Sequence, residues 1–451
     1  MNKIILIFSA LLLSGCYSGV LSDMKPAKTP NVWTSYKDKI NQSKETKDLH
    51  KWWQKFDDPA LNELIIIAFE NSPQRGIAEA RILEARGIRR TTRSFLFPQI
   101  GASAQTGQQD TGMSDGDNFY EATFDASYEI DIFGRNRNAT KAATASIKNL
   151  EENYYNVTLT MIGEIARDYI DYRRFQTQAD IAQKNLDVQE KTLKLVRNLK
   201  KFGEAPQLDV EQAENLVNTT KSSIPEFERL AQNARLRLSV LTGELDQDLS
   251  NILNQDASIP TTDIMPVLIA PADIIALRPD VRAATYNLTA ATALTEAAIA
   301  DLYPKFTLSG FFGVTKSALV SSTSIWNVSL GAAVSLIDFG RIEGQIDAAR
   351  AIEKRAFEAY RLATLEAVRD VETALSDYAH LNEQEQYLYD AFQNAQKALK
   401  LSQLLYQEGE VSFLNVLQAQ RTLNDSDRAL INIKADRSQS LIRLYKSIGV
   451  Y

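Results

Sequence analysis

The chain has 451 residues, of which 44% are hydrophobic and 24% are charged, a composition typical of a folded protein. Its net charge of -7 and pI near 5.3 argue against a nucleic-acid-binding protein, because phosphate contact normally needs clustered Lys and Arg. A single cysteine excludes an intramolecular disulfide and a cysteine-based metal cage.

The chain begins with the three parts of a secretory signal. A short polar start is followed by an apolar run at residues 4–13, too short to span a bilayer as a helix, and then by Ser14-Gly15-Cys16. Residues 13–16 resemble a bacterial lipobox, which implies that residues 1–15 are a signal peptide and that Cys16 receives a diacylglycerol and an N-acyl chain. An ordinary signal peptide that contains a cysteine is the alternative. Tyr17 rather than Asp follows, so the usual inner-membrane retention signal is missing.

Several short motifs recur at a constant spacing, which indicates a duplicated chain. Pro73 and Pro279 are 206 positions apart, and the other matched motifs keep this offset. They are Pro98 with Pro304, Phe133-Gly134-Arg135 with Phe339-Gly340-Arg341, Gly203-Glu204 with Gly409-Glu410, and Gln212-Ala213 with Gln418-Ala419. We therefore expect two tandem repeats, at 60–245 and 271–451, with a connector at 246–270 and an extended segment at 16–59.

Each repeat is expected to contain a helix, two strands, a long helix, a turn and a last helix. The strands are expected at about residues 99–110 and 119–132 in the first repeat, and 305–315 and 325–338 in the second. Along residues 119–131 polar and apolar side chains alternate, which predicts a strand with one face exposed to water and one apolar face. Glu121, Asp125 and Glu129 lie on the polar face.

This acidic face limits where the strands can lie. If the strands cross a membrane, a charged side chain facing lipid would cost up to about 2–4 kcal/mol near the midplane, somewhat less for a carboxylate. The acidic face of such strands must therefore face water. An amphipathic hairpin packed on a soluble core fits the alternation equally well. Four strands cannot close a membrane barrel, since the smallest barrels need about eight. Either the chain oligomerises or the strands do not cross a membrane.

A very long helix is expected after the strands of each repeat. Proline is absent from residues 99–205 and 305–451, and Ile165, Tyr172, Ala179, Leu186 and Leu193 recur with the seven-residue spacing of a coiled coil. A helix over about 135–201 would be about 100 Å long, at about 1.5 Å per residue. In an exported protein such a length suits a structure that reaches across the periplasm.

Four segments carry a family resemblance. They are Trp53-Gln54-Lys55-Phe56-Asp57-Asp58-Pro59-Ala60-Leu61, Leu277-Arg278-Pro279-Asp280, Asp338-Phe339-Gly340-Arg341, and Tyr406-Gln407-Glu408-Gly409 leading to Val416-Leu417-Gln418-Ala419-Gln420. Their order and spacing resemble the TolC-like outer-membrane factors, in particular the lipoprotein branch of OprM- and NodT-type proteins. The resemblance covers nearly the whole chain, from Trp52 to Gly449.

This resemblance implies a mainly α-helical fold with β-strands, in which three copies form a twelve-stranded transmembrane β-barrel joined to a long periplasmic α-helical barrel. Glu121, Asp125 and Glu129 would line the barrel lumen. The homotrimer would sit in the outer membrane of a Gram-negative bacterium, in contact with outer-membrane lipid. It would receive substrates through a periplasmic adaptor (a membrane fusion protein) from an inner-membrane pump of the RND type.

The resemblance also implies roles for the two turns at the far ends of the helices. The adaptor would dock at Gly203, Glu204, Ala205, Gly409, Glu410 and Val411. A periplasmic gate is implied at Asp209, Asn415 and Gln418. Family members often carry aspartates where this chain has Asn415 and Gln418, so Glu408 and Glu410 are an alternative acidic collar.

Other functions find less support. The two histidines, His50 and His380, form no metal-binding pair, and no phosphate loop or nucleophile elbow occurs, so we expect no enzyme, no catalytic residue, no metal and no cofactor other than the lipid on Cys16. An outer-membrane duct for type I protein secretion is an alternative within the same class. A lipid-anchored periplasmic coiled-coil scaffold without a pore is the alternative from a different class.

Overall fold

The computed structural model describes residues 30, 33, 50–109, 117–255, 257–262, 271–317 and 320–451. Cys16, the predicted signal peptide and residues 263–270 of the connector lie outside the described residues. The chain divides into two compact units. Unit 1 includes Ala80–Asn153 and Asp280–Leu365, and unit 2 is Thr29–Glu79, Tyr154–Pro279 and Glu366–Tyr451.

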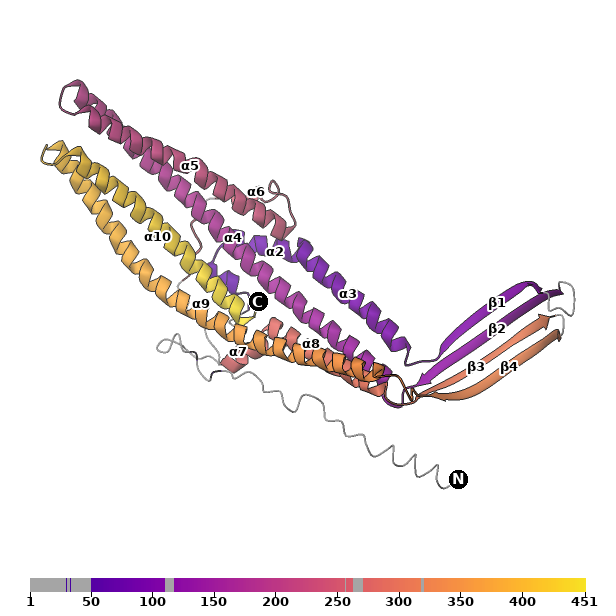
Figure 1. The fold of residues 1–451 in the computed structure, drawn as a ribbon. Helices are drawn as coiled ribbons and strands as arrows, with labels where there is room; N and C mark the ends of the chain where they lie inside the picture. Colours follow the sequence, from indigo (N-terminus) through magenta and orange to yellow (C-terminus); the bar gives the residue numbers. More distant parts are fainter. Residues whose placement is uncertain are drawn as a thin grey trace. The chain divides into compact units, whose positions relative to one another are not determined.

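The order of elements confirms a mainly helical fold with strands and an internal duplication (Figure 1). The elements are η3 (Trp52–Phe56), α2 (Pro59–Asn71), α3 (Pro73–Ser94), β1 (Gln99–Gln109), β2 (Asp117–Ile130), α4 (Arg135–Lys201), α5 (Gln207–Thr242), α6 (Ser250–Leu253), α7 (Pro271–Leu277), α8 (Pro279–Ala300), β3 (Lys305–Ser317), β4 (Val320–Ala333), α9 (Arg341–Gln407) and α10 (Phe413–Ile448). Equivalent helices of the two repeats have equal lengths: 22 residues for α3 and α8, 67 for α4 and α9, and 36 for α5 and α10.

Unit 1 contains one antiparallel sheet with the strand order β1-β2-β3-β4, and Figure 1 shows the four strands side by side. Each repeat supplies one hairpin, and the two hairpins join through β2 and β3. Among the described strands, β1 and β4 are therefore the edges of the sheet. Their outer backbone groups are available to pair with another strand.

The strand bounds differ from the predicted ones mainly in the second repeat. There β4 ends at Ala333, whereas alternation predicts a strand to about residue 338. In the first repeat β2 continues to Ile130, where it pairs with β3. The residues equivalent to the end of β2 are 334–336, which lie beyond β4 and pair with none of the described strands.

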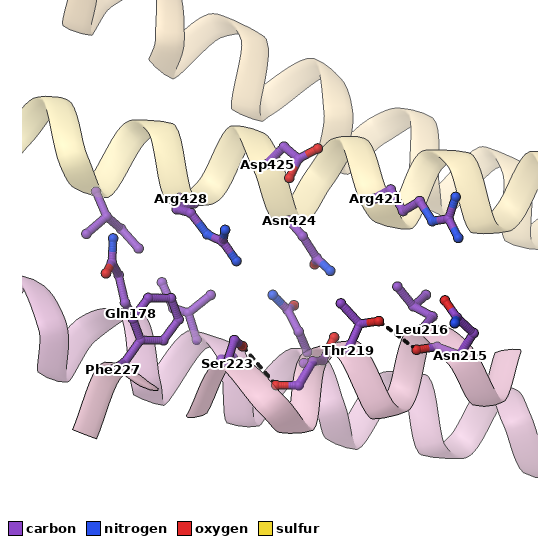
Figure 2. Close-up of a pocket in the computed structure, with 15 residues that line it drawn as sticks. Gln178, Asn215, Leu216, Thr219, Ser223, Phe227, Arg421, Asn424, Asp425 and Arg428 are labelled. Carbon is purple, nitrogen blue, oxygen red and sulfur yellow. Dashed lines mark hydrogen bonds between the residues drawn. The ribbon is translucent and has the colours of Figure 1, made fainter. Parts of the chain in front are cut away.

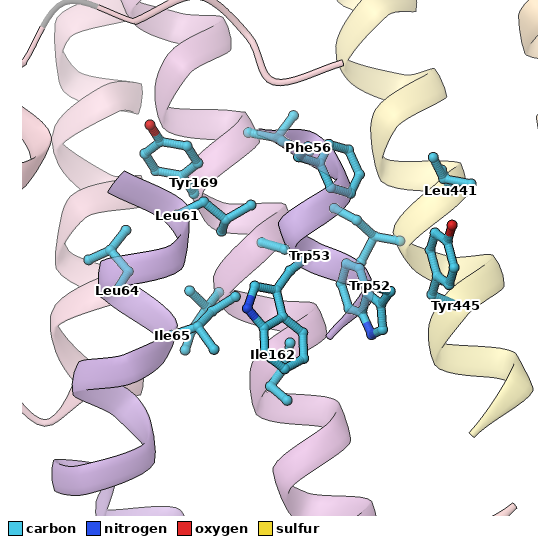
Figure 3. Close-up of a cluster of buried hydrophobic side chains, with 14 of the residues drawn as sticks. Trp52, Trp53, Phe56, Leu61, Leu64, Ile65, Ile162, Tyr169, Leu441 and Tyr445 are labelled. Carbon is cyan, nitrogen blue, oxygen red and sulfur yellow. The ribbon is translucent and has the colours of Figure 1, made fainter. Parts of the chain in front are cut away.

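The core of unit 2 is built around the segment from Trp52 to Leu61 (Figure 3). Trp52 is fully buried, and its ring stacks on Tyr445 of α10 with centroids 5.3 Å apart. Figure 3 shows η3 and α2 placing Trp53, Leu61 and Ile65 in the same cluster. Burial of these large side chains, at about 1.5–3 kcal/mol each, fixes η3 and α2 against the long helices of unit 2.

A buried polar network ties the same core to the connector. Asp58 caps α2 by accepting a hydrogen bond from the Leu61 amide, and it accepts a second from the Tyr169 hydroxyl at 3.0 Å. Arg173, 1% exposed, donates from Nε to that hydroxyl and from Nη1 to the Leu253 carbonyl. Through these hydrogen bonds Arg173, which lies in α4, holds the Leu253 end of the connector close to that helix.

Two glycines end the last helix of each repeat in the left-handed conformation. Gly243 (φ 77°) follows α5 and Gly449 (φ 85°) follows α10, again 206 positions apart. A Cβ on Gly243 would lie 2.3 Å from the Asn71 carbonyl oxygen, and one on Gly449 would lie 2.9 Å from the Arg278 Cα. Each glycine thus lets the end of one helix meet the start of another.

None of the described helices is long and apolar enough to cross a membrane.

Replacing Gly243 with alanine should lower the stability of the protein by about 1–3 kcal/mol, because the new Cβ both strains a left-handed backbone and meets a carbonyl. Thermal unfolding of the detergent-solubilised protein measures the effect. Gly76→Ala is the matched control, since Gly76 lies in the same unit, within a helix, with nothing within 4 Å of its added Cβ. An unfolding temperature of Gly243→Ala equal to that of the parent would contradict this packing.

Candidate functional site

The sheet has one polar face, formed by every second residue of each strand. Directly paired residues in an antiparallel sheet point to the same side, so the register defines this face. Asp125 of β2 pairs with Gly101, and Phe311 of β3 pairs with Asp125 and with Asn327 of β4. The other polar members are Gln99, Ser103, Gln105, Glu121, Thr123, Ser127, Glu129, Lys305, Thr307, Ser309, Thr315, Thr323 and Ser329. The same register also places the apolar Phe119 and Ile325 on this face.

The three predicted acidic residues lie on this polar face but in different surroundings. Glu121 accepts a hydrogen bond from Gln105 Nε2 at 2.8 Å. Asp125 is exposed, and a Cβ on Gly101 would come within 2.9 Å of its carboxylate, so glycine leaves room for the charge. Glu129 is half-buried near the start of α4, where Asn136 donates to it at 3.4 Å. Asp125 is thus the carboxylate most open to water.

The opposite face of the sheet is apolar and exposed. Phe124, Phe312 and Trp326 form one row across three strands, each 58–73% exposed. Val328 and Leu330 of β4 are similarly exposed. An exposed apolar surface of this kind marks contact with lipid or protein. The sheet therefore has one polar face and one exposed apolar face.

The two predicted turns at the ends of the long helices have the same backbone structure. Gly203 (φ 79°) and Gly409 (φ 76°) are left-handed, as a helix-ending glycine requires. The Glu204 amide donates to the Leu199 carbonyl, and the Glu410 amide donates to the Leu405 carbonyl, both at 2.9 Å. These bonds close a Schellman motif at each turn. A Cβ on either glycine would meet nothing within 4 Å, so both turns have open space beside them.

The side chains around the turns are not equivalent. Ala205 is buried in the cluster that joins the two helical hairpins, whereas Val411, its counterpart, is half-buried. Phe413 is 1% exposed, and its ring lies 5.4 Å from that of Tyr406. The equivalent positions in the first repeat hold Gln207 and Lys200, which form a hydrogen bond instead. The backbone of the turn is repeated, but its packing is not.

The predicted gate residues lie next to these turns. Asp209 is in the first turn of α5, where a negative charge is favoured by the helix dipole. Burial raises the pKa of the Asp209 carboxyl, and burial together with the Asp209 charge raises the pKa of Tyr406. Asn415 and Gln418 are exposed on α10. The structure thus brings Asp209 close to Tyr406, a residue that the sequence did not single out for the gate.

A polar pocket lies further along unit 2, between α4, α5 and α10 (Figure 2). Arg421, Asn424 and Arg428 point from α10 toward the other two helices, and Arg428 lies 5.6 Å over the Phe227 ring. Facing them are amide and hydroxyl side chains, among them Gln178, Asn215, Thr219 and Ser223. The pocket offers hydrogen-bond donors and positive charge, as the wall of a polar passage or groove does.

The family model of outer membrane efflux proteins matches this chain twice, at residues 64–244 and 270–450. The chain belongs to the outer membrane efflux protein family. The two matches are shifted by 206 positions, the offset of the duplicated motifs, helices and turns.

Relatives and solved structures agree with this assignment. The pyoverdine export outer membrane protein OpmQ of Pseudomonas aeruginosa is 30% identical, over 100% of this chain and 97% of its own length. The toluene efflux pump outer membrane protein TtgF of Pseudomonas putida is 28% identical, over 98% and 95%. The structure of the outer-membrane channel OprN matches with a TM-score of 0.85 and 27% identity, over 95% of this chain and 99% of that one.

This outer membrane efflux protein is therefore a channel subunit of a tripartite efflux system, located in the outer membrane of a Gram-negative bacterium. It is not an enzyme. Proteins of this kind act together with a periplasmic adaptor and an inner-membrane pump, and the family resemblance in the sequence is confirmed.

Three exposed residues at the two helix turns are not among the site residues that the sequence predicts. Leu208 and Leu414 are equivalent positions directly after the two turns, and they are 63% and 54% exposed. Phe202, 79% exposed, lies in the first turn. Exposed leucines at corresponding places in both repeats could have been found by comparing the repeats for apolar residues at the starts of helices.

Proposed function

We propose that three copies of this chain form a channel for small molecules, with the polar face of the sheet lining the passage. Four strands from each copy would make a closed barrel of twelve, in which every strand edge is paired. The observation that carries the proposal is the sheet itself, which has one polar face, one exposed aromatic face and two edges. In a bilayer, open sheet edges are not tolerated, because their backbone groups find no partner in lipid.

The proposal extends to the adaptor, from the two helix turns, and to the pump, from the family. We propose that the turns at Gly203 and Gly409 dock the adaptor, and that the pump is of the RND type. The open space beside both glycines and the exposed Leu208 and Leu414 support docking there. Asp209, with Tyr406 beside it, and Asn415 with Gln418 are proposed to form the gate at this end.

Small molecules are the proposed substrates, because relatives are described as exporting pyoverdine and toluene. Pyoverdine and toluene differ greatly in polarity, so selection is expected mainly in the pump and adaptor. A duct for secreted proteins is the second candidate. It has less support, since the named relatives serve small-molecule export.

Lipidation of Cys16 is proposed from the lipobox-like sequence at residues 13–16. Mass spectrometry of the mature protein should show an N-terminal Cys16 that carries a diacylglycerol and an N-acyl chain. A mature N-terminus elsewhere, or an unmodified Cys16, would mean an ordinary signal peptide.

Asp125→Asn tests the channel wall. Purified trimers in planar bilayers should lose roughly half of their cation-over-anion permeability ratio, because three equivalent charges in the water-filled passage disappear. Ser127→Asn is the matched control, since Ser127 lies on the same face two residues along and carries no charge. A channel that conducts ions but keeps its selectivity in Asp125→Asn would place Asp125 outside the passage. Protein that does not conduct at all would favour the scaffold.

Substitutions of Gly409 test adaptor docking. Gly409→Asn adds a side chain to the turn with little backbone strain, because asparagine tolerates the left-handed conformation, whereas Gly409→Val adds both bulk and strain. We expect both variants to form trimers and to lose export in a drug-susceptibility assay, with recovery of the adaptor on the trimer reduced.

Gly344→Asn is the control for added bulk, since Gly344 lies in α9 with nothing within 4 Å of its Cβ. If Gly409→Asn exports normally and only Gly409→Val fails, the turn matters for its conformation and is not a docking surface.

A further inference from the structure

The polar pocket between α4, α5 and α10 contains positive charge that the fold itself does not use (Figure 2). Arg421 and Arg428 line it from α10 and are both exposed. Within the described part of the chain, neither guanidinium takes part in an ion pair or a hydrogen bond. By contrast Arg237, in the same unit, pairs with Asp168 at 2.7 Å. The two guanidiniums at the pocket therefore keep all of their hydrogen-bond donors available.

The two arginines lie on one face of α10. They are seven residues apart, which is two helical turns or about 10.5 Å along the axis. Asn424 lies between them, and Figure 2 shows all three side chains pointing toward α5. The equivalent residues in the first repeat, 206 positions earlier, are the uncharged Asn215 and Ser222. The pair of positive charges thus belongs to α10 alone and is not a general property of the duplicated helices.

Phe227 of α5 holds one of these guanidiniums in place. The Phe227 ring is 8% exposed, and the Arg428 guanidinium lies 5.6 Å over it. Such a contact occupies the flat face of the guanidinium and leaves the N–H groups in its plane free. Those N–H groups form the planar fork that binds a carboxylate through two parallel hydrogen bonds. Arg428 is therefore held in the pocket with its anion-binding edge unoccupied.

The wall opposite α10 supplies hydrogen-bonding groups without charge. Asn215, Thr219 and Ser223 follow one another at four-residue spacing on one face of α5. The Thr219 hydroxyl donates to the Asn215 carbonyl and the Ser223 hydroxyl donates to the Thr220 carbonyl, at 2.9 and 2.8 Å. Each hydroxyl oxygen remains as an acceptor, because only its proton is used. This wall can thus bind hydroxyl or amide groups of a ligand.

Two buried amides adjoin the pocket. Gln420 precedes Arg421, Gln189 lies one turn after the lining residue Asn185, and both amides are 3% exposed. In the described part of the chain, the Gln420 Nε2 and both polar atoms of the Gln189 amide have no hydrogen-bond partner. Buried amides without partners are rare, because burial removes their water. This end of the pocket therefore has more hydrogen-bonding capacity than the three helices use among themselves.

The size and lining of the pocket limit the kind of ligand. Its volume is about 390 Å³, within the range of sites for small organic molecules. Three lining side chains are charged, Arg421 and Arg428 against Asp425, so the lining has a net charge of +1. Ile181 and Leu216 add apolar surface. A ligand with an acid group at each end and an apolar or hydroxylated middle would match this distribution.

We propose that this pocket is a binding site for organic dianions of the dicarboxylate class. One carboxylate binds the Arg421 guanidinium, the other binds Arg428, and the chain between them lies along α10 past Asn424. The site is formed by the helices of a single chain, so it goes beyond the proposed channel and does not depend on it.

Three ligands of equal chain length test the proposal. Suberate carries a carboxylate at each end, octanoate carries one, and octamethylenediamine carries an ammonium at each end. Isothermal titration of the detergent-solubilised full-length protein at physiological salt should show suberate binding. Octanoate should bind at least about ten-fold more weakly, because it loses one charge-assisted contact, and the diamine should not bind. Equal affinity for octanoate would overturn the two-arginine arrangement, and equal affinity for the diamine would overturn an anion site altogether.

Substitutions assign the binding to these residues. Arg421→Gln and Arg428→Gln should each weaken suberate binding about ten-fold, since glutamine keeps an amide but loses the charge. Asp425→Asn should strengthen binding about two- to five-fold, because it removes a like charge. Arg229→Gln is the matched control, since Arg229 is an exposed arginine of α5 that does not line the pocket. All four substituted residues are exposed, so the unfolding temperature should match that of the parent.

Other results would refute the site. Suberate affinity that is unchanged in both Arg421→Gln and Arg428→Gln, or weakened equally by Arg229→Gln, would place the anion elsewhere. Weaker binding in Asp425→Asn would mean that the pocket does not select negative charge. Conductance in planar bilayers separates this proposal from the channel. Protein that conducts but does not bind suberate refutes the site alone, and protein that binds suberate but does not conduct refutes the channel alone.

Discussion

An open sheet with two faces of opposite polarity is the constraint on which the rest of this structure depends. One face carries Asp125 and a series of hydroxyl and amide side chains, and the other carries exposed Phe124, Phe312 and Trp326. The helices of unit 1 leave the apolar face uncovered, since these three aromatic side chains are 58–73% exposed. Lipid on one side and water on the other satisfy both faces, but only if the edges β1 and β4 find partners.

The parts of this arrangement that follow from local chemistry could be predicted from the sequence. Strict alternation around Glu121 and Asp125 gave the faces of β2, because side chains of a strand alternate by geometry. The constant offset between the repeats gave the order of the elements. Gly203 and Gly409 were found as turn residues, since a helix that ends in a left-handed residue favours glycine. Each of these depends on residues close together in the chain.

What could not be predicted depends on contacts between distant residues. Alternation predicts that β4 ends near residue 338, but the strand ends at Ala333, beyond which none of the described strands pairs with it. Ala205 was placed at a docking surface but packs into the core beside its turn. The hydrogen bond from the Tyr169 hydroxyl to Asp58 joins positions 111 residues apart, and no spacing in the sequence predicts it.

Duplication has preserved backbone geometry more strictly than side-chain chemistry. The left-handed glycines recur at every equivalent turn, because no other residue adopts that conformation without cost. The neighbouring side chains have diverged: Lys200 and Gln207 share a hydrogen bond where Tyr406 and Phe413 share an apolar contact. In an assembly of three copies, six turns would therefore have one backbone shape but two alternating chemistries. A partner that contacted only the backbone would bind all six turns alike. A partner that contacts the side chains can distinguish the two kinds of turn, and three copies of it can then bind with the three-fold symmetry of the channel.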